Sequence, residues 1–192
     1  PANDRWTTDR WKVPHSESTD WNFERIYRIN FFLQEAGAKF GEDINGSQNT
    51  IGGDLATIKH YIGEMYFLRA YAYYKKYLNV GDFPIIKEPL PDDAAVLTEA
   101  SKRAPRNEVA RFILEDLDKA YQYMSAKDLA TTRINKDVAK LMASRVALFE
   151  ATWLQNFNGT AFVPGGNGWP GGAGYSYPAG SLDAEVKYFL GV

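Results

Sequence analysis

The segment DLATIKHYIGEMYFLRAYAYYKKYL, from Asp54 to Leu78, carries apolar side chains at helical spacing on two neighbouring faces. One face is formed by Ile58, Ile62, Met65, Leu68 and Ala72, and the other by Phe67, Tyr71, Tyr74 and Leu78. A helix that is apolar over so wide an arc is predicted to lie between other helices rather than on a surface. Five tyrosines in this region share the helical spacing, so we predict that they belong to the core; they are Tyr66, Tyr71, Tyr73, Tyr74 and Tyr77.

Helical patterns also occur on both sides of this segment. A first helix is predicted from Asp20 to Ala36, with Ser18, Thr19 or Asp20 as its cap and Gly37 at its C-terminal end. Two more are predicted from Asn107 to Tyr123 and from Asn135 to Trp153, and a last one begins at Ser181. The helix from Asn135 has one face of large side chains and an opposite face of small ones, Ala139, Ala143 and Ala147, that would let a neighbouring helix approach.

These patterns together predict an all-α fold. No long run alternates as a strand would, and the segment Phe83–Leu90 reads as extended chain because Pro84 and Pro89 disfavour helix before them. Helix pairs joined by loops, without a heptad register, favour an α-solenoid or an irregular bundle. Arg69 and Arg145 lie among the apolar positions and are interpreted as structural arginines, paired or extended toward solvent.

Composition excludes several classes of function. The 192 residues contain 22 Lys and Arg against 24 Asp and Glu, which gives a net charge of −2. Binding to nucleic acid by bulk charge needs a basic face, so no nucleic-acid partner is expected. The chain has no Cys and only two His, His15 and His60, in unrelated contexts, so neither a cofactor nor a metal site is expected. Adjacent carboxylates such as Glu115 and Asp116 diverge on a helix, which makes them poor acid/base partners and argues against an enzyme.

Residues 156–180, the glycine-rich loop, contain the main candidate for ligand binding. The run NFNGTAFVPGGNGWPGGAGYSYPAG cannot form a helix, and long loops in compact domains are commonly functional. Flat aromatic rings on loops can stack on the apolar faces of sugars, while amides bind the hydroxyls. The candidates here are Trp169, Tyr175, Tyr177, Phe162 and Asn167, and a second candidate pair is Trp6 and Trp11. The alternative is that the rings of the loop fix it to the helices or contact a partner protein.

Several segments resemble the SusD-like (SusD/RagB) family of bacterial outer-membrane nutrient-binding lipoproteins. They are Trp21-Asn22 with Tyr27, Ile29 and Asn30, then GEMYFLRAYAYYKKYLNVGDFPIIKEPL (63–90), RNEVARFILEDLDKAY (106–121) and INKDVAKLMASRVALFEATW (134–153). The resemblance implies a tetratricopeptide-like scaffold of helix pairs with long inserted loops. We expect residues 1–192 to be one incomplete domain, with helix pairs at about 20–80 and 107–154 followed by the glycine-rich loop.

The resemblance also implies a binding function without catalysis. Members bind oligosaccharide or polysaccharide at the cell surface and deliver it to a SusC-like TonB-dependent transporter of the outer membrane. They attach to the membrane through an N-terminal lipid anchor, whose cysteine is absent from this chain. Three alternatives remain open at this stage: a peptide-binding protein, a lid that only docks on the transporter, and an all-helical carbohydrate-active enzyme.

Overall fold

The computed structural model describes residues 19–41, 43–126 and 132–192, and this part of the chain is all-α, as predicted. Its elements are a 3₁₀ helix η1 (Thr19–Trp21) and the helices α1 (Glu24–Phe40), α2 (Leu55–Val80), α3 (Ala94–Ala100), α4 (Arg106–Tyr123), α5 (Lys136–Asn156) and α6 (Leu182–Leu190). The one β-bridge of the described residues joins Phe83 to Ala104, so the segment from Phe83 to Leu90 is extended but belongs to no sheet. No helix in the described ranges is long and apolar enough to cross a membrane.

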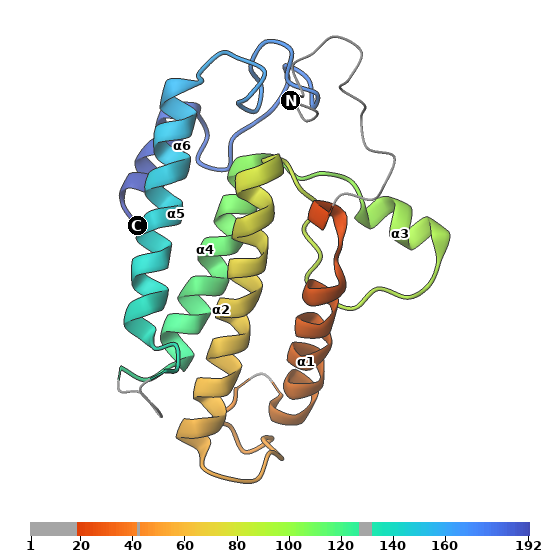
Figure 1. Ribbon diagram of the computed structural model, residues 1–192, viewed down its shortest axis with the longest axis vertical. Coiled ribbons are helices and arrows are strands. Elements are labelled where there is room, and N and C mark those ends of the chain that lie inside the picture. Colours follow the sequence, from red (N-terminus) through yellow and green to blue (C-terminus); the bar gives the residue numbers. More distant parts are fainter. Residues whose placement is uncertain (1–18, 42, 127–131) are drawn as a thin grey trace, which may run out of the picture.

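The long helices pack in chain order. Helix α1 descends beside α2, which ascends; α4 descends again and α5 ascends, as Figure 1 shows. The main contacts join α1 to α2, α2 to α4, α4 to α5 and α5 to α6. Serial packing of antiparallel helices, each against its neighbours, is typical of helical-pair scaffolds.

Helix α2 lies at the centre, and its two ends follow from local chemistry. Asp54 caps its start, because the Asp54 carboxylate accepts hydrogen bonds from the Thr57 amide (2.8 Å) and hydroxyl (2.6 Å). Gly81 ends it with a φ of 74°, a conformation that favours glycine. The buried face differs from the prediction: Leu68, Tyr71 and Leu78 are partly exposed. Tyr73 and Tyr77 are buried as predicted, and Ala70, which was not predicted, is buried beside them.

A glycine inside α2 sets its distance from α4. A Cβ on Gly63 would lie 2.7 Å from Met124 Cγ and 3.0 Å from Tyr123 Cβ, closer than such atoms approach. Glycine is unfavourable inside a helix, so its presence at position 63 is explained by this close contact. Further along α2, the Tyr73 hydroxyl donates to the Ile86 carbonyl and accepts from the Ile86 amide, which fixes the extended segment against α2.

Both boundaries of α1 differ from the sequence prediction, and one helix was not predicted. Helix α1 begins at Glu24, after Asn22, whose side chain accepts a hydrogen bond from the Glu24 amide at 2.8 Å. It continues through Gly37 and ends before Gly41, which has a φ of 71°. Helix α3 was not predicted; it has no buried residue, and Asp93 caps it. Asn135 and Ser181 cap α5 and α6 as expected.

The small face of α5 packs as predicted, whereas part of its large face lies at the surface. Leu141 is 70% exposed, and Val138 and Arg145 also lie at the surface. The small side chains Ala139, Ala143 and Ala147 form the buried face, because they allow close approach to a neighbouring helix. Arg69, by contrast, is buried and paired as expected: its guanidinium binds the Asp116 carboxylate of α4 in a bidentate manner, at 2.7 and 2.8 Å.

Candidate functional site

The glycine-rich loop connects α5 to α6 and folds back over the ends of the long helices, at the top of Figure 1. Because α5 extends to Asn156, the loop begins at Phe157. Successive backbone hydrogen bonds close a turn about every three residues, from Phe157 to Gly172. The glycines serve these turns: Gly165 and Gly168 have positive φ, and a Cβ on Gly166 would lie 2.0 Å from the Thr160 carbonyl oxygen.

Three predicted site residues come together as one group of rings. Trp169 contacts Tyr175 edge to face at 5.5 Å between centroids, and Tyr175 contacts Tyr177 in the same way at 4.9 Å. All three are half-buried, and each has a hydrogen-bond partner. The Trp169 indole donates to Asp82 at 2.8 Å, the Tyr175 hydroxyl donates to Glu108 at 2.8 Å, and the Tyr177 hydroxyl donates to the Pro164 carbonyl at 2.6 Å. The first two bonds attach the loop to the turn after α2 and to α4, and the third lies within the loop.

The tyrosine hydroxyls of this group are held in their neutral form. Burial raises the pKa of Tyr177 to about 12. Burial also raises the pKa of Tyr175 far above its ordinary value, and the nearby Glu108 carboxylate adds to the effect. Both hydroxyls therefore remain hydrogen-bond donors at any physiological pH.

The other predicted residues lie apart from this group. Phe162 is 62% exposed and touches only the edge of Phe157 among the rings of the described residues. Asn167 is exposed, and its backbone N–H donates to the Gly159 carbonyl. Trp6 and Trp11 lie outside the described residues.

A groove of about 370 Å³, the aromatic groove, separates the glycine-rich loop from the C-terminal end of α2. Phe162, Trp169 and Pro170 of the loop form one wall, and Asn79 and Asp82 lie on the α2 side. The remaining lining is basic and aromatic, with Arg103, Arg106, Phe149 and Trp153. Trp169 and Phe162 are thus the two predicted residues that the structure places in one cavity.

Arg106, which lines the aromatic groove, belongs to a buried ion pair. Arg106, in the first turn of α4, binds Glu150 of α5 at 2.9 Å, and the Tyr77 hydroxyl of α2 contacts both groups. The Arg106 guanidinium also lies 4.0 Å from the centre of the Trp153 ring, a cation–π contact. Burial alone would lower the pKa of Arg106, but the Glu150 carboxylate outweighs it and raises the pKa, so the guanidinium stays charged.

The carboxylates near the groove are all engaged in structural contacts. One oxygen of Asp82 accepts from the Arg106 amide at 2.8 Å and the other from Trp169. Glu150 is fully buried in its ion pair, and Glu108 accepts from Tyr175. Within the described ranges, no cluster of His, Asp or Glu is arranged to hold a metal ion. What the groove offers a ligand is aromatic surface, guanidinium groups and an amide, which suits binding.

Comparison with known proteins gives this geometry a context. Residues 4–148 match the model of a SusD-like family described as starch-binding and associating with the outer membrane. The chain belongs to the SusD-like family. No curated protein matches it.

One solved SusD-like structure shares the fold of this chain, and a second is reported for comparison. A SusD-like protein from Bacteroides fragilis NCTC 9343 has a TM-score of 0.53 and 25% sequence identity, over 67% of this chain and 22% of that protein. A laminarin-binding SusD-like protein has a TM-score of 0.49 and 22% identity, over 68% of this chain and 25% of that protein. The chain therefore spans less than a third of the length of either SusD-like neighbour.

Only some of the residues that line the aromatic groove lie within the SusD-like match. The matched residues end at Leu148, inside α5, and include the α2 side of the groove with Asn79, Asp82 and Arg106. Trp153, Phe162 and Trp169 follow the match. The sequence did not predict the helical residues of the groove, because nothing in the pattern distinguishes Arg106 or Trp153 from core positions. The Gly81-Asp82 turn was the one sequence feature that could have indicated this side of the groove.

Proposed function

We propose that this chain is the helical part of a non-enzymatic SusD-like protein that binds oligosaccharide at the cell surface for delivery to a TonB-dependent transporter of the outer membrane. The family description, starch-binding and associating with the outer membrane, supports both the ligand class and the place. The observation that carries the proposal is the aromatic groove, in which exposed and half-exposed rings face guanidinium and amide groups.

Each component of the groove matches a part of a sugar. Aromatic faces pack against the C–H surface of a pyranose ring, and Phe162, with 62% of its surface exposed, is free to do so. Asn79 and Arg103 at the rim provide polar groups for hydroxyls. The engagement of Asp82, Glu108 and Glu150 in structural hydrogen bonds supports a binding role over hydrolysis, which requires a pair of available carboxylates.

Phe162→Ala tests the proposal more sharply than a change at Trp169. Truncating Trp169 would also remove the hydrogen bond to Asp82, whereas the side chain of Phe162 supports little else. We expect Phe162→Ala to weaken retardation in native gels containing starch or laminarin by about fivefold, since one aromatic contact contributes about 1 kcal/mol.

Leu141→Ala is the matched control. It also removes a large exposed apolar side chain from the described surface, but from a part of α5 outside the groove. It should leave retardation unchanged. Equal retardation of the wild type and Phe162→Ala would contradict the assignment of the groove, and no retardation of the wild type by any neutral or acidic glycan would contradict the proposed function.

A further inference from the structure

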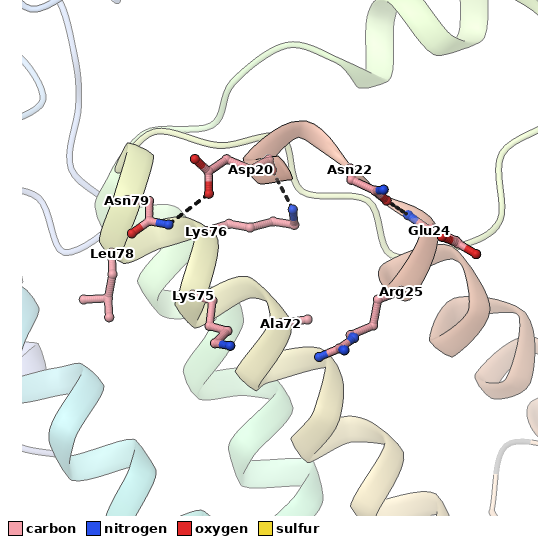
Figure 2. Close-up of a pocket in the computed structure, with 9 residues that line it drawn as sticks. All are labelled: Asp20, Asn22, Glu24, Arg25, Ala72, Lys75, Lys76, Leu78 and Asn79. Carbon is pink, nitrogen blue, oxygen red and sulfur yellow. Dashed lines mark hydrogen bonds between the residues drawn. The ribbon is translucent and has the colours of Figure 1, made fainter. Parts of the chain in front are cut away.

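A second cavity, of about 630 Å³, lies between the start of α1 and the C-terminal half of α2 (Figure 2). We call it the basic pocket, because Arg25, Lys75 and Lys76 contribute to its lining. It contains none of the residues singled out from the sequence as binding candidates. Its lining shares Leu78 and Asn79 with the aromatic groove, so the two cavities lie on either side of the last turns of α2.

The acidic residues at the edge of the basic pocket are already used. The Glu24 carboxylate pairs with Arg28 at 2.6 Å, one turn further along α1. The Asp20 carboxylate accepts a hydrogen bond from Asn79 at 2.9 Å, and the Asp20 carbonyl accepts one from Lys76 at 2.5 Å (Figure 2). Because Glu24 is paired with Arg28, the three cations of the pocket lie near one other carboxylate, Asp20, and positive charge is in excess.

Two of these cations have no acidic partner within the described residues. Arg25 forms no ion pair or hydrogen bond there, and the Lys75 ammonium has only a cation–π contact, 5.5 Å from the Tyr71 ring. In Figure 2, Arg25 extends from α1 toward α2, and its guanidinium and the Lys75 ammonium lie on either side of Ala72. The small side chain of Ala72 leaves the space near them open.

The third cation is held in place by its surroundings. Lys76 is half-buried, and its ammonium lies 5.7 and 5.4 Å from the centres of the Phe23 and Phe83 rings. Burial lowers the pKa of Lys76, against a smaller opposite effect of Asp20. A charge that is partly removed from water gains more from a nearby anion than an exposed one does.

We propose that the basic pocket binds the anionic group of an acidic sugar, a uronic acid carboxylate or a sulfate ester. Arg25 and Lys75 would contact the anion directly, since a guanidinium fork matches the geometry of both groups, and Lys76 supplies a fixed positive charge. A sugar chain seated in the aromatic groove can reach the pocket across Leu78 and Asn79. The inference rests on the proposed function for the identity of the ligand as a sugar, but the anion site itself does not.

Isothermal titration calorimetry of the full chain with trigalacturonate tests the inference. We expect binding that weakens with added NaCl and that falls about tenfold or more in the double variant Arg25→Gln/Lys75→Gln, which loses two charge-assisted hydrogen bonds. The matched control is Lys140→Gln/Arg145→Gln, which removes the same charge from exposed positions of α5 and should bind as the wild type does. Circular dichroism checks that both variants are folded.

The probes separate the sources of charge. If a sulfated disaccharide competes with trigalacturonate, the pocket recognises negative charge from either source; if it does not, the pocket is specific for the carboxylate. Equal affinity for the uncharged methyl ester of trigalacturonate, no binding of any acidic probe, or unchanged affinity in the double variant would overturn the inference. Retardation by neutral laminarin reports the aromatic groove separately, so either assignment can fail while the other stands.

Discussion

The helical scaffold and the glycine-rich loop are stabilised by different interactions, although the loop packs on the helices of the scaffold. Between α2, α4 and α5 the contacts are mainly apolar, around buried side chains such as Tyr73, Ile113 and Leu154. The loop contributes one fully buried apolar side chain to the described core, Val163. It is also held by the partly buried rings of Phe157 and Tyr177 and by hydrogen bonds from Trp169 and Tyr175. The difference indicates that the loop can change in sequence or conformation without a large effect on the fold.

The largest effect is expected at the charged centre of the scaffold. Asp116→Ala leaves the Arg69 guanidinium buried without its carboxylate, and such a loss costs about 3–5 kcal/mol. We expect the free energy of unfolding in urea to fall by that amount. The hydrogen bonds from Arg69 to Asn30 and to the Lys87 carbonyl keep the guanidinium in its buried position after the carboxylate is removed. Asp118→Ala, at an exposed position of the same helix, is the control and should change it by less than about 0.5 kcal/mol. Equal effects of the two changes would show that the buried pair does not stabilise the scaffold.

A smaller effect separates two helical glycines. Gly63→Ala forces α2 away from Met124 and should destabilise the protein by about 1–3 kcal/mol, although alanine is the better helix former. Gly37→Ala, inside α1, meets no atom within 4 Å and should stabilise it by about 0.5–1 kcal/mol. Thermal unfolding measures both. A stabilising Gly63→Ala would mean that α2 and α4 are not held at this distance.

The smallest effect is expected in the glycine-rich loop. Tyr175→Phe removes the hydroxyl that binds Asn107 and Glu108 but keeps the ring, a loss of about 0.5–1.5 kcal/mol. We expect faster proteolysis and amide exchange within the loop, with little change in exchange of the buried amides of α4. Tyr121→Phe, at the surface of α4, is the control. If α4 and the loop respond equally, the two regions unfold as one unit.

The sequence predicted the scaffold better than the site, for physical reasons. Asp54, Asn135 and Ser181 mark helix starts through local hydrogen bonds that follow from residue type alone. On α5 the alanine face was predicted correctly, whereas Val138 and Leu141 of the large face are exposed. The pattern of side-chain size alone does not show which positions meet a neighbouring helix.

The candidate site depends on distances that no local pattern contains. The sequence identified the rings of the glycine-rich loop, but their roles differ. Tyr175 binds α4 and Tyr177 bonds within the loop, while Phe162 and Trp169 line the groove. The opposite wall is formed by side chains from α2, the turn after it, α4 and α5, such as Asp82 and Arg106, that meet only in the folded chain. Whether these residues bind sugar stays a prediction.

Asp82 has a consequence for how a ligand would be sensed. One of its oxygens holds the Arg106 amide at the start of α4, and the other holds the Trp169 indole. A ligand that draws Trp169 away from Asp82 leaves that carboxylate with a single partner, and a ligand that moves Asp82 disturbs the first turn of α4. For a ligand that acts in either way, occupancy of the groove and order at the start of α4 would be thermodynamically linked, and each would influence the other by the same free energy.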